Sequence, residues 1–347
     1  MNIEINKLTP QKCKVLQNSK AIYICDFRAL GESFDHEIPA MWKYENIAPW
    51  ILQGKCVAVN EDFENIKYFN ENDFVVVKKD KYAKVSVVKR LEKVFPFDSY
   101  ENVDSIYAFV PHPDIDSFAM KHNLHLNYTY DDFQKYNSKL EQKKLLKNLT
   151  PSWNEIYRIR DLSKYMGKKF FLKKSFGSGG YSVSDLSKLD NEIDVNLEDS
   201  WFVEKKEGGE SMSVQCYKEG RSVKIFGLCK QILNDGKEFT GGEILNLEVL
   251  EKDSFLIDMI TESICSLNSL IEKYDGFFGI DFLYDAKMGK YFFLEANVRL
   301  TAMSIPVLLS NLLGKEKSKF LEDVANQVGG GLILTYDMLM KTCDVLS

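Results

Sequence analysis

The run FFLEANVRL, residues 292–300, follows an apolar stretch with three polar side chains at intervals of two, Glu295, Asn297 and Arg299. Because a β-strand sends alternate side chains to the same face, these three are expected to point the same way. Carboxylate and amide oxygens suit Mg²⁺, and a guanidinium group binds phosphate through a planar fork. The run therefore predicts a buried strand that ends in a site for a metal ion and an anion.

A hairpin would bring a second carboxylate to this site. In GIDFLYDAKMGKYFFLEAN, residues 279–297, Asp281 and Glu295 both lie seven residues from Met288. A turn centred on Met288 would place them opposite each other, with their Cβ atoms about 5 Å apart. The same count pairs two further sets of residues: Leu283 with Phe293, and Asp285 with Tyr291.

Two carboxylates at that separation repel each other unless a cation lies between them. We therefore expect Asp281, Glu295 and Asn297 to bind Mg²⁺, with Mn²⁺ as an alternative. The competing interpretation is that the two acids are solvated ends of an edge strand. The flanking apolar runs GFFGI and YFFL, which are typical of buried strands, disfavour it.

A second candidate site lies in FFLKKSFGSGGYSVS, residues 170–184. Lys173 stands at the end of an apolar strand, where its charge suits a polyphosphate. The loop that follows allows backbone N–H groups to wrap an anion, and its candidate residues are Ser175, Gly177, Gly179 and Gly180. The alternative is a plain flexible turn, and the GxxxxGK[ST] pattern of a Walker A loop is absent.

Bulk properties exclude several classes of protein. The 347 residues suggest two or three domains, and the net charge of −6 disfavours a broad nucleic-acid surface. The seven cysteines form no CxxC pair, so neither a disulfide framework nor a zinc site is expected. We find no signal-peptide core and no apolar run long enough to span a membrane, and a cytoplasmic location is expected.

The first third of the chain alternates apolar runs with polar segments. Four runs are predicted to be strands, with a helix around 39–52 between two of them: residues 21–27, 55–60, 73–79 and 105–113. This alternation favours an open α/β sheet. No GxGxxG follows any of these strands, so a dinucleotide site is not expected.

A domain boundary is predicted close to residue 130. Asp131 and Asp132 can cap a helix that starts near Phe133, and a second helix is expected over 139–147. The remainder is rich in predicted strands, at 168–174, 199–206, 211–232 and 276–297. Three further helices are expected, at 252–274, 303–313 and 317–342, the last interrupted by Gly329–Gly331.

Residues 130–315 resemble the ATP-grasp superfamily. The resemblance rests on four features in this order: a lysine, the LKKSFGSGG loop, the WFVEKK strand and the LEANVRLT end of the hairpin. Members commonly read E-x-N-x-R at the hairpin end. The resemblance implies an N-terminal open α/β pre-grasp domain (1–130), followed by a two-lobed ATP-grasp domain of α+β type (131–347). Its lid would span about 150–205 and its C-terminal lobe about 206–347.

The resemblance also implies roles for individual residues. Lys139 and Lys173 look like the two lysines that hold nucleotide phosphates, and the loop over 175–180 looks like the flap above them. Glu204 and Lys205 resemble the hinge that meets adenine. Glu210 is similar to the acid that holds the ribose, with Glu207 as a competitor.

VKIFGLCKQILNDGKEFTGGE, residues 223–243, resembles the middle segment of carboxylate–amine ligases, which make peptides and amino-acid conjugates. Such an enzyme would use ATP and Mg²⁺ to form an acyl phosphate, which an amine then attacks. Arg299, Lys173 and Lys230 are the expected catalytic residues. Amino acids or peptides are the expected substrates, and a homodimer is an option because dimers are common among relatives. Two alternatives stay open: a small-molecule kinase on the same scaffold, and a nucleotide-binding regulatory protein without turnover.

Overall fold

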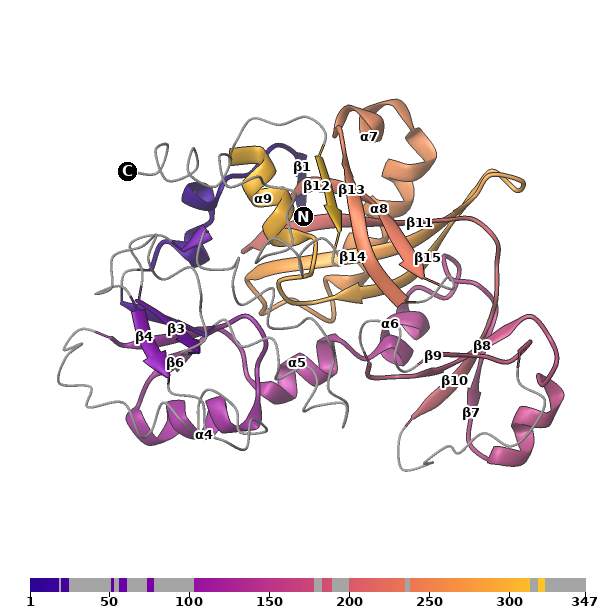
Figure 1. Cartoon of the computed structure of the whole chain (residues 1–347), viewed down its shortest axis with the longest axis horizontal. Helices are drawn as coiled ribbons and strands as arrows, with labels where there is room; N and C mark the ends of the chain where they lie inside the picture. The colour runs from indigo at the N-terminus through magenta and orange to yellow at the C-terminus, as the bar shows by residue number, and fades with distance from the viewer. Residues whose placement is uncertain are drawn as a thin grey trace.

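The computed structural model describes most of the chain (Figure 1). The described residues are 1–18, 20–24, 51–52, 56–60, 74–77, 103–177, 183–188, 200–234, 238–312 and 318–321. Most of the helix predicted around 39–52 lies outside this part, as do Gly179, Gly180 and Gly329–Gly331. Within it, no helix is long and apolar enough to cross a bilayer.

An all-parallel sheet forms the N-terminal part, in the order β4-β3-β2-β5-β6. Its strands are β2 (Ala21–Ile24), β3 (Cys56–Asn60), β4 (Phe74–Val77), β5 (Ser105–Ala108) and β6 (His125–Leu126). Helix α4 (Pro113–His122) buries Ile115, Phe118 and Ala119 against β2 and β5. The open α/β sheet that the apolar runs predict is therefore present.

Two short helices lead out of this sheet, α5 (Tyr130–Tyr136) and α6 (Lys139–Leu145). Helix α5 starts earlier than the expected Phe133, because Thr129 caps it: the Thr129 hydroxyl accepts from the Asp132 N–H at 3.2 Å. Asp132 accepts in return from the Thr129 N–H, which completes a capping box. Ser138 caps α6 in the same way, by accepting from the Glu141 N–H.

The predicted lid is a small antiparallel sheet in the order β7-β10-β8-β9. Its strands are β7 (Trp153–Ile156), β8 (Phe170–Lys174), β9 (Val183–Asp185) and β10 (Trp201–Lys205). A 3₁₀ helix, η7 (Ile159–Lys164), adds Leu162 to an apolar cluster with Leu172 and Val203. This cluster is separate from the main core, so the lid has a core of its own.

The large sheet has the order β15-β14-β11-β12-β13-β16, and β1 (Asn2–Ile5) pairs parallel to β12. Its other strands are β11 (Glu210–Glu219), β12 (Ser222–Asn234), β13 (Glu238–Leu245), β14 (Gly276–Asp285), β15 (Lys290–Asn297) and β16 (Ser318–Leu321). The strand-rich segment 211–232 forms the antiparallel pair of β11 and β12. One expectation needs correction: residues 318–321 form a strand rather than a helix, because they pair with the edge of β13.

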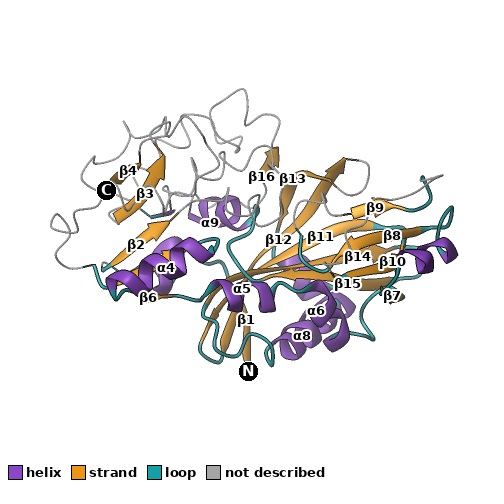
Figure 2. Ribbon diagram, turned by 90° about the horizontal axis from the view of Figure 1, so that it is seen from below, coloured by secondary structure: helices purple, strands orange, loops and turns teal. Residues whose placement is uncertain are grey.

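Helices α7 (Glu248–Lys252), α8 (Ser254–Leu267) and α9 (Ser304–Leu312) complete the described elements, with the 3₁₀ turns η1 (Pro10–Lys12) and η2 (Lys14–Leu16). Figure 2 shows α6 and α8 together beside β15, and both helices contact that strand. Tyr107 and Phe109 of the N-terminal part share one core cluster with Tyr217 and Phe277 of the large sheet. The division near residue 130 therefore stays a prediction.

Gly209 supports the join between the lid and the large sheet. Its φ is +148°, and a Cβ there would lie 2.2 Å from the Tyr284 carbonyl oxygen, opposite the start of β11. We expect Gly209→Ala to lower the free energy of unfolding by about 1–3 kcal/mol in urea denaturation. Gly208→Ala is the matched control, because a Cβ on Gly208 meets nothing within 4 Å. Equal stability of the two variants would contradict this expectation.

Candidate nucleotide and metal site

Strand pairing places Asp281 of β14 directly opposite Glu295 of β15, as the turn count predicts. The other two predicted pairs are wrong, because Leu283 pairs with Phe292 and Asp285 with Lys290. A β-bulge between Asp281 and Phe282 shifts the register by one residue. The hairpin thus has a shorter turn than expected, and the bulge restores the two acids to opposite positions.

Amide side chains connect the two acids. The Asn297 Nδ2 donates to Asp281 Oδ2 at 3.1 Å and to Glu295 Oε1 at 3.4 Å. Gln231 of β12 donates its Nε2 to Asp281 Oδ1 at 3.1 Å, and Ser211 donates to the Gln231 Oε1. The acids predicted to bind a metal therefore share one hydrogen-bonded cluster.

The two acids have opposite pKa shifts. Burial, together with the nearby Glu295 charge, raises the pKa of Asp281 to about 7. Burial acts to raise the pKa of Glu295, but Lys139, Lys173 and Asn297 together outweigh it and the net shift is downward. At neutral pH, Glu295 is ionised while Asp281 holds a proton for much of the time. A cation bound between them would displace that proton.

The chemistry of the donor set fits a hard cation. Asp281, Glu295 and Asn297 offer only oxygen ligands, as Mg²⁺ requires. Over the part of the chain that the structure describes, no group of three or more His, Cys, Asp or Glu side chains is placed to hold a metal ion. A magnesium ion here would accordingly need water or phosphate oxygens to complete its six ligands.

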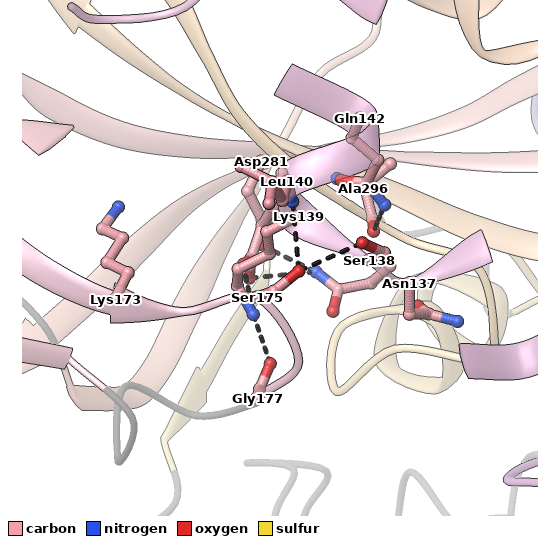
Figure 3. A network of polar contacts seen from close by, with 12 residues as sticks. Asn137, Ser138, Lys139, Leu140, Gln142, Lys173, Ser175, Gly177, Asp281 and Ala296 are labelled. Atoms are coloured by element: carbon pink, nitrogen blue, oxygen red, sulfur yellow. Dashed lines mark hydrogen bonds and ion pairs between the residues drawn. The ribbon is translucent and has the colours of Figure 1, made fainter. Parts of the chain in front are cut away.

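The N-terminus of α6 meets the start of the glycine loop at this cluster (Figure 3). The Lys139 N–H donates to the Ser175 carbonyl at 2.8 Å, and the hydroxyls of Ser138 and Ser175 lie 3.0 Å apart. The Lys139 ammonium donates to the Gly177 carbonyl and lies 2.9 Å from Glu295 Oε2. Lys139 thus joins the loop to a predicted metal ligand. Gly179 and Gly180 lie outside the described residues.

A second lysine of α6, Lys143, was not predicted. It is fully buried and forms an ion pair with Glu204 of β10, which also pairs with Lys173 of β8. Burial acts to raise the pKa of Glu204, but the two lysines hold it below its usual range. The spacing of four residues between Lys139 and Lys143, which gives them the same helix face, could have identified this lysine.

The expected adenine contact of Glu204 has to be reconsidered, because its side chain is 2% exposed and its carboxylate is held by Lys143 and Lys173. The neighbouring Lys205 is exposed, and its ammonium lies 2.8 Å from Glu207 Oε1. Any adenine contact in this segment therefore involves its backbone more readily than the Glu204 side chain.

Lys230, which is expected to be a catalytic residue, lies on the face of the sheet opposite Asp281. It pairs with Met212, whereas Asp281 pairs with the next residue, Ser213. Consecutive residues of a strand face opposite sides, so Lys230 projects away from Asp281. Its ammonium binds Glu210 Oε1 at 2.6 Å on that opposite face. The structure therefore does not bring Lys230 together with Asp281, and its expected catalytic role stays a prediction. This placement gives no support to a ribose contact by Glu210.

Arg299 stays with the cluster. Its side chain is largely buried, donating from NH2 to the Asn297 Oδ1 at 2.9 Å and from NH1 to the Leu300 carbonyl. The guanidinium therefore orients the amide that bridges the two acids. Its charge also contributes to stabilising the ionised form of Asp281, where it acts to lower the pKa.

The buried ion triplet of Glu204 yields a prediction about stability. Glu204→Gln leaves two lysines without their shared counterion, and we expect a loss of about 3–5 kcal/mol in the free energy of unfolding. The control is Glu248→Gln, whose partner Lys252 is exposed and 3.4 Å away; its expected loss is below about 1 kcal/mol. Similar urea midpoints for both variants would contradict the burial of this triplet.

The raised pKa of Asp281 predicts a pH dependence of stability without metal. The pKa of Asp281 is 3.8 in the unfolded chain and about 7 in the folded chain, so the folded state binds this proton more tightly. Tighter proton binding stabilises the fold at low pH, and that stabilisation is lost as the pH rises through 7. Asp281→Asn cannot ionise. In EDTA, its stability relative to the unsubstituted protein should rise by about 2–3 kcal/mol between pH 5 and pH 8. A relative stability that stays constant or falls over this range would refute the shift.

Comparison with known proteins identifies the fold. Residues 136–303 match a family model described as ATP-grasp domain. An L-amino acid ligase from Bacillus licheniformis superposes with a TM-score of 0.52 at 15% identity, covering 83% of this chain and 68% of the ligase. An N5-carboxyaminoimidazole synthetase from Staphylococcus aureus, complexed with ADP, gives a TM-score of 0.55 at 15% identity, covering 92% and 84% of the two chains.

A biotin carboxylase from Campylobacter jejuni gives a TM-score of 0.53 at 17% identity, covering 94% of this chain and 70% of the carboxylase. At these identities the likeness shows a shared fold. Among curated protein sequences nothing matches. Residues 136–303 therefore match the ATP-grasp domain, and the chain shares the fold of these enzymes.

Proposed function

We propose that this chain is an ADP-forming carboxylate–amine ligase that joins its substrates through an acyl phosphate. The observation that carries the proposal is the position of Lys139. Its ammonium contacts both Glu295, in the opposed pair of acids, and Gly177, in the glycine loop. Phosphates held at this lysine would lie between a metal-binding pair of carboxylates and a loop with backbone N–H groups, as phosphoryl transfer from ATP requires.

Three lysines would bind the triphosphate. Lys139 and Lys143 come from α6 and Lys173 from β8. Lys139 is paired with Glu295, whereas Lys143 and Lys173 share the buried Glu204. Each ammonium group has three N–H donors, so it can bind a phosphate oxygen in addition to its carboxylate, and the positive charge compensates the nucleotide. The loop that begins at Ser175 and Gly177 and continues through Gly179 and Gly180 would cover the phosphates. The backbone around Lys205 would meet the adenine.

Asp281, Glu295 and Asn297 would hold Mg²⁺, or Mn²⁺ in its place. When bound, the metal would draw negative charge from the β- and γ-phosphate oxygens. The Asn297 side chain would then turn its oxygen toward the metal, and Arg299 would be available for a phosphate or the anionic substrate.

In the proposed reaction, an oxygen of the substrate carboxylate attacks the γ-phosphorus, and the bond to the β-phosphate oxygen breaks to release ADP. Lys173 and Arg299 would stabilise the charge that develops on the transferred group. The nitrogen of the amine substrate then attacks the acyl carbon, phosphate leaves, and the amine proton passes to solvent or a nearby carboxylate. The chain's main contributions are positioning, positive charge and exclusion of water.

The similar L-amino acid ligase suggests amino acids or peptides as substrates. A screen of amino acids and short peptides, read by ADP release and by mass spectrometry of products, tests this. ADP formation that needs both a carboxylate and an amine supports a ligase. A phosphorylated product formed from a single substrate would instead support a kinase, and nucleotide binding without turnover would support a regulatory protein.

Glu295 provides the sharpest test of this site. We expect Glu295→Ala to lower ADP formation by at least about 100-fold, because it removes one of two charged metal ligands. Glu219→Gln, at the far end of β11, is the control and should retain full activity. Circular dichroism verifies that both variants fold. Unchanged turnover by folded Glu295→Ala would refute the metal assignment.

A further inference from the structure

The strand that carries the proposed metal ligands lies at an edge of the large sheet. Strand β15 pairs with β14 on one side, and no other strand described here pairs with its other side. The outward N–H and C=O groups of an edge strand do little to fix its register unless something else binds them. A slip of one residue would turn Glu295 and Asn297 to the opposite face.

The bulge makes this edge more sensitive. It interrupts the β14–β15 ladder next to the pair of Asp281 and Glu295, at the point where register matters most. After the pair of Asp281 and Glu295, only two more pairs follow toward the end of β15: Ile280 with Ala296, and Gly279 with Asn297. The end of the strand therefore has little ladder of its own to hold it in place.

Two amide side chains bind the outward backbone of this segment. Gln142 of α6 accepts from the Ala296 N–H at 2.8 Å and donates to the Ala296 carbonyl at 2.7 Å, as a neighbouring strand would. Asn137, just before α6, accepts from the Val298 N–H at 2.8 Å and donates to the Val298 carbonyl at 3.4 Å. Figure 3 shows Asn137, Gln142 and Ala296 beside Lys139.

Both amides are themselves held firmly. Gln142 is fully buried and its Nε2 also donates to the Tyr136 carbonyl at 2.8 Å. The Asn137 Nδ2 donates to the Phe133 carbonyl at 2.8 Å. Each amide thus connects the backbone of α5 to the end of β15. Gln142 binds Ala296, which lies between Glu295 and Asn297 in the sequence. Asn137 binds Val298, which lies between Asn297 and Arg299.

We propose that Gln142 and Asn137 are positioning residues for the metal site: they take the place of a missing neighbouring strand and fix the backbone from which Glu295, Asn297 and Arg299 project. The inference rests on the proposed function, since it concerns how the same site is held. It also explains how the lysine of α6 and the ligands of β15 keep a constant relative position, because one helix binds both.

The test measures Mn²⁺ affinity in the presence of ADP, by electron paramagnetic resonance. Gln142→Met keeps the length of the side chain and loses its hydrogen bonds, and Asn137→Ala loses the second pair of bonds. We expect the two variants to bind Mn²⁺ about 10–100-fold more weakly. Binding of ADP in EDTA should change less than about threefold, because neither amide contacts the lysines that hold the phosphates.

Asn311→Ala is the matched control. Its Nδ2 donates to two backbone carbonyls, of Leu8 and Phe226, each at 3.1 Å, and both bonds lie outside the metal cluster. Its Mn²⁺ affinity should stay within about threefold of the unsubstituted protein. Asn137→Asp keeps the acceptor for the Val298 N–H but loses the donor to the Phe133 and Val298 carbonyls, so it should recover only part of the affinity that Asn137→Ala loses. Thermal melts follow folding in every variant.

The outcomes separate this inference from the proposed function. If Glu295→Gln binds Mn²⁺ as well as the unsubstituted protein does, the metal site and the inference both fail. If Glu295→Gln loses the metal while folded Gln142→Met and Asn137→Ala retain it, the inference alone fails. An equal loss in Asn311→Ala would show general destabilisation and overturn it too. If Gln142→Met does not fold, the comparison of Mn²⁺ affinity between Asn137→Ala and Asn137→Asp tests the inference. Equal affinity of these two variants would contradict it.

Discussion

The pairing of Asp281 with Glu295 across one hairpin is the constraint on which the rest of the site depends. Two carboxylates brought together in this way are unfavourable unless protons, amides or cations compensate their charge. The structure shows all three kinds of compensation: a raised pKa at Asp281, the bridging amide of Asn297, and the ammonium of Lys139 beside Glu295. Because a proton and the Lys139 ammonium already compensate the two carboxylates, a divalent cation could take their place at this site.

Helix α6 contacts several of the elements that surround the two acids. Its N-terminus binds the start of the glycine loop through Ser138 and Lys139, its next turn carries Lys143 to the buried Glu204, and Gln142 binds the strand of the acids. One seven-residue helix therefore contacts the loop, the small sheet β7–β10 and the hairpin of Asp281 and Glu295. Because these contacts come from one rigid element, a shift of α6 would affect all three together.

Much of this arrangement follows from local patterns in the sequence, and the failures have identifiable physical causes. Counting from Met288 predicts the opposed acids even though the turn is shorter than the count assumes, because the bulge offsets the difference. The bulge that displaces the other pairs has no comparable local signal. The orientation of Lys230 depends on the register between β11 and β12, and the ion pairs of Glu204 depend on packing between α6 and the lid. Such tertiary relations are not encoded in spacing along one strand.

The central claim is that Asp281 and Glu295 bind one divalent cation together. The most direct measurement is a crystal structure with Mn²⁺ and ADP, in which anomalous scattering locates the metal independently of any assumed chemistry. The account predicts a peak about 2.0–2.3 Å from an oxygen of each carboxylate, with the Asn297 oxygen and nucleotide phosphate completing the ligands. A metal bound through phosphates alone, with the two carboxylates still joined by the Asn297 amide, would contradict it.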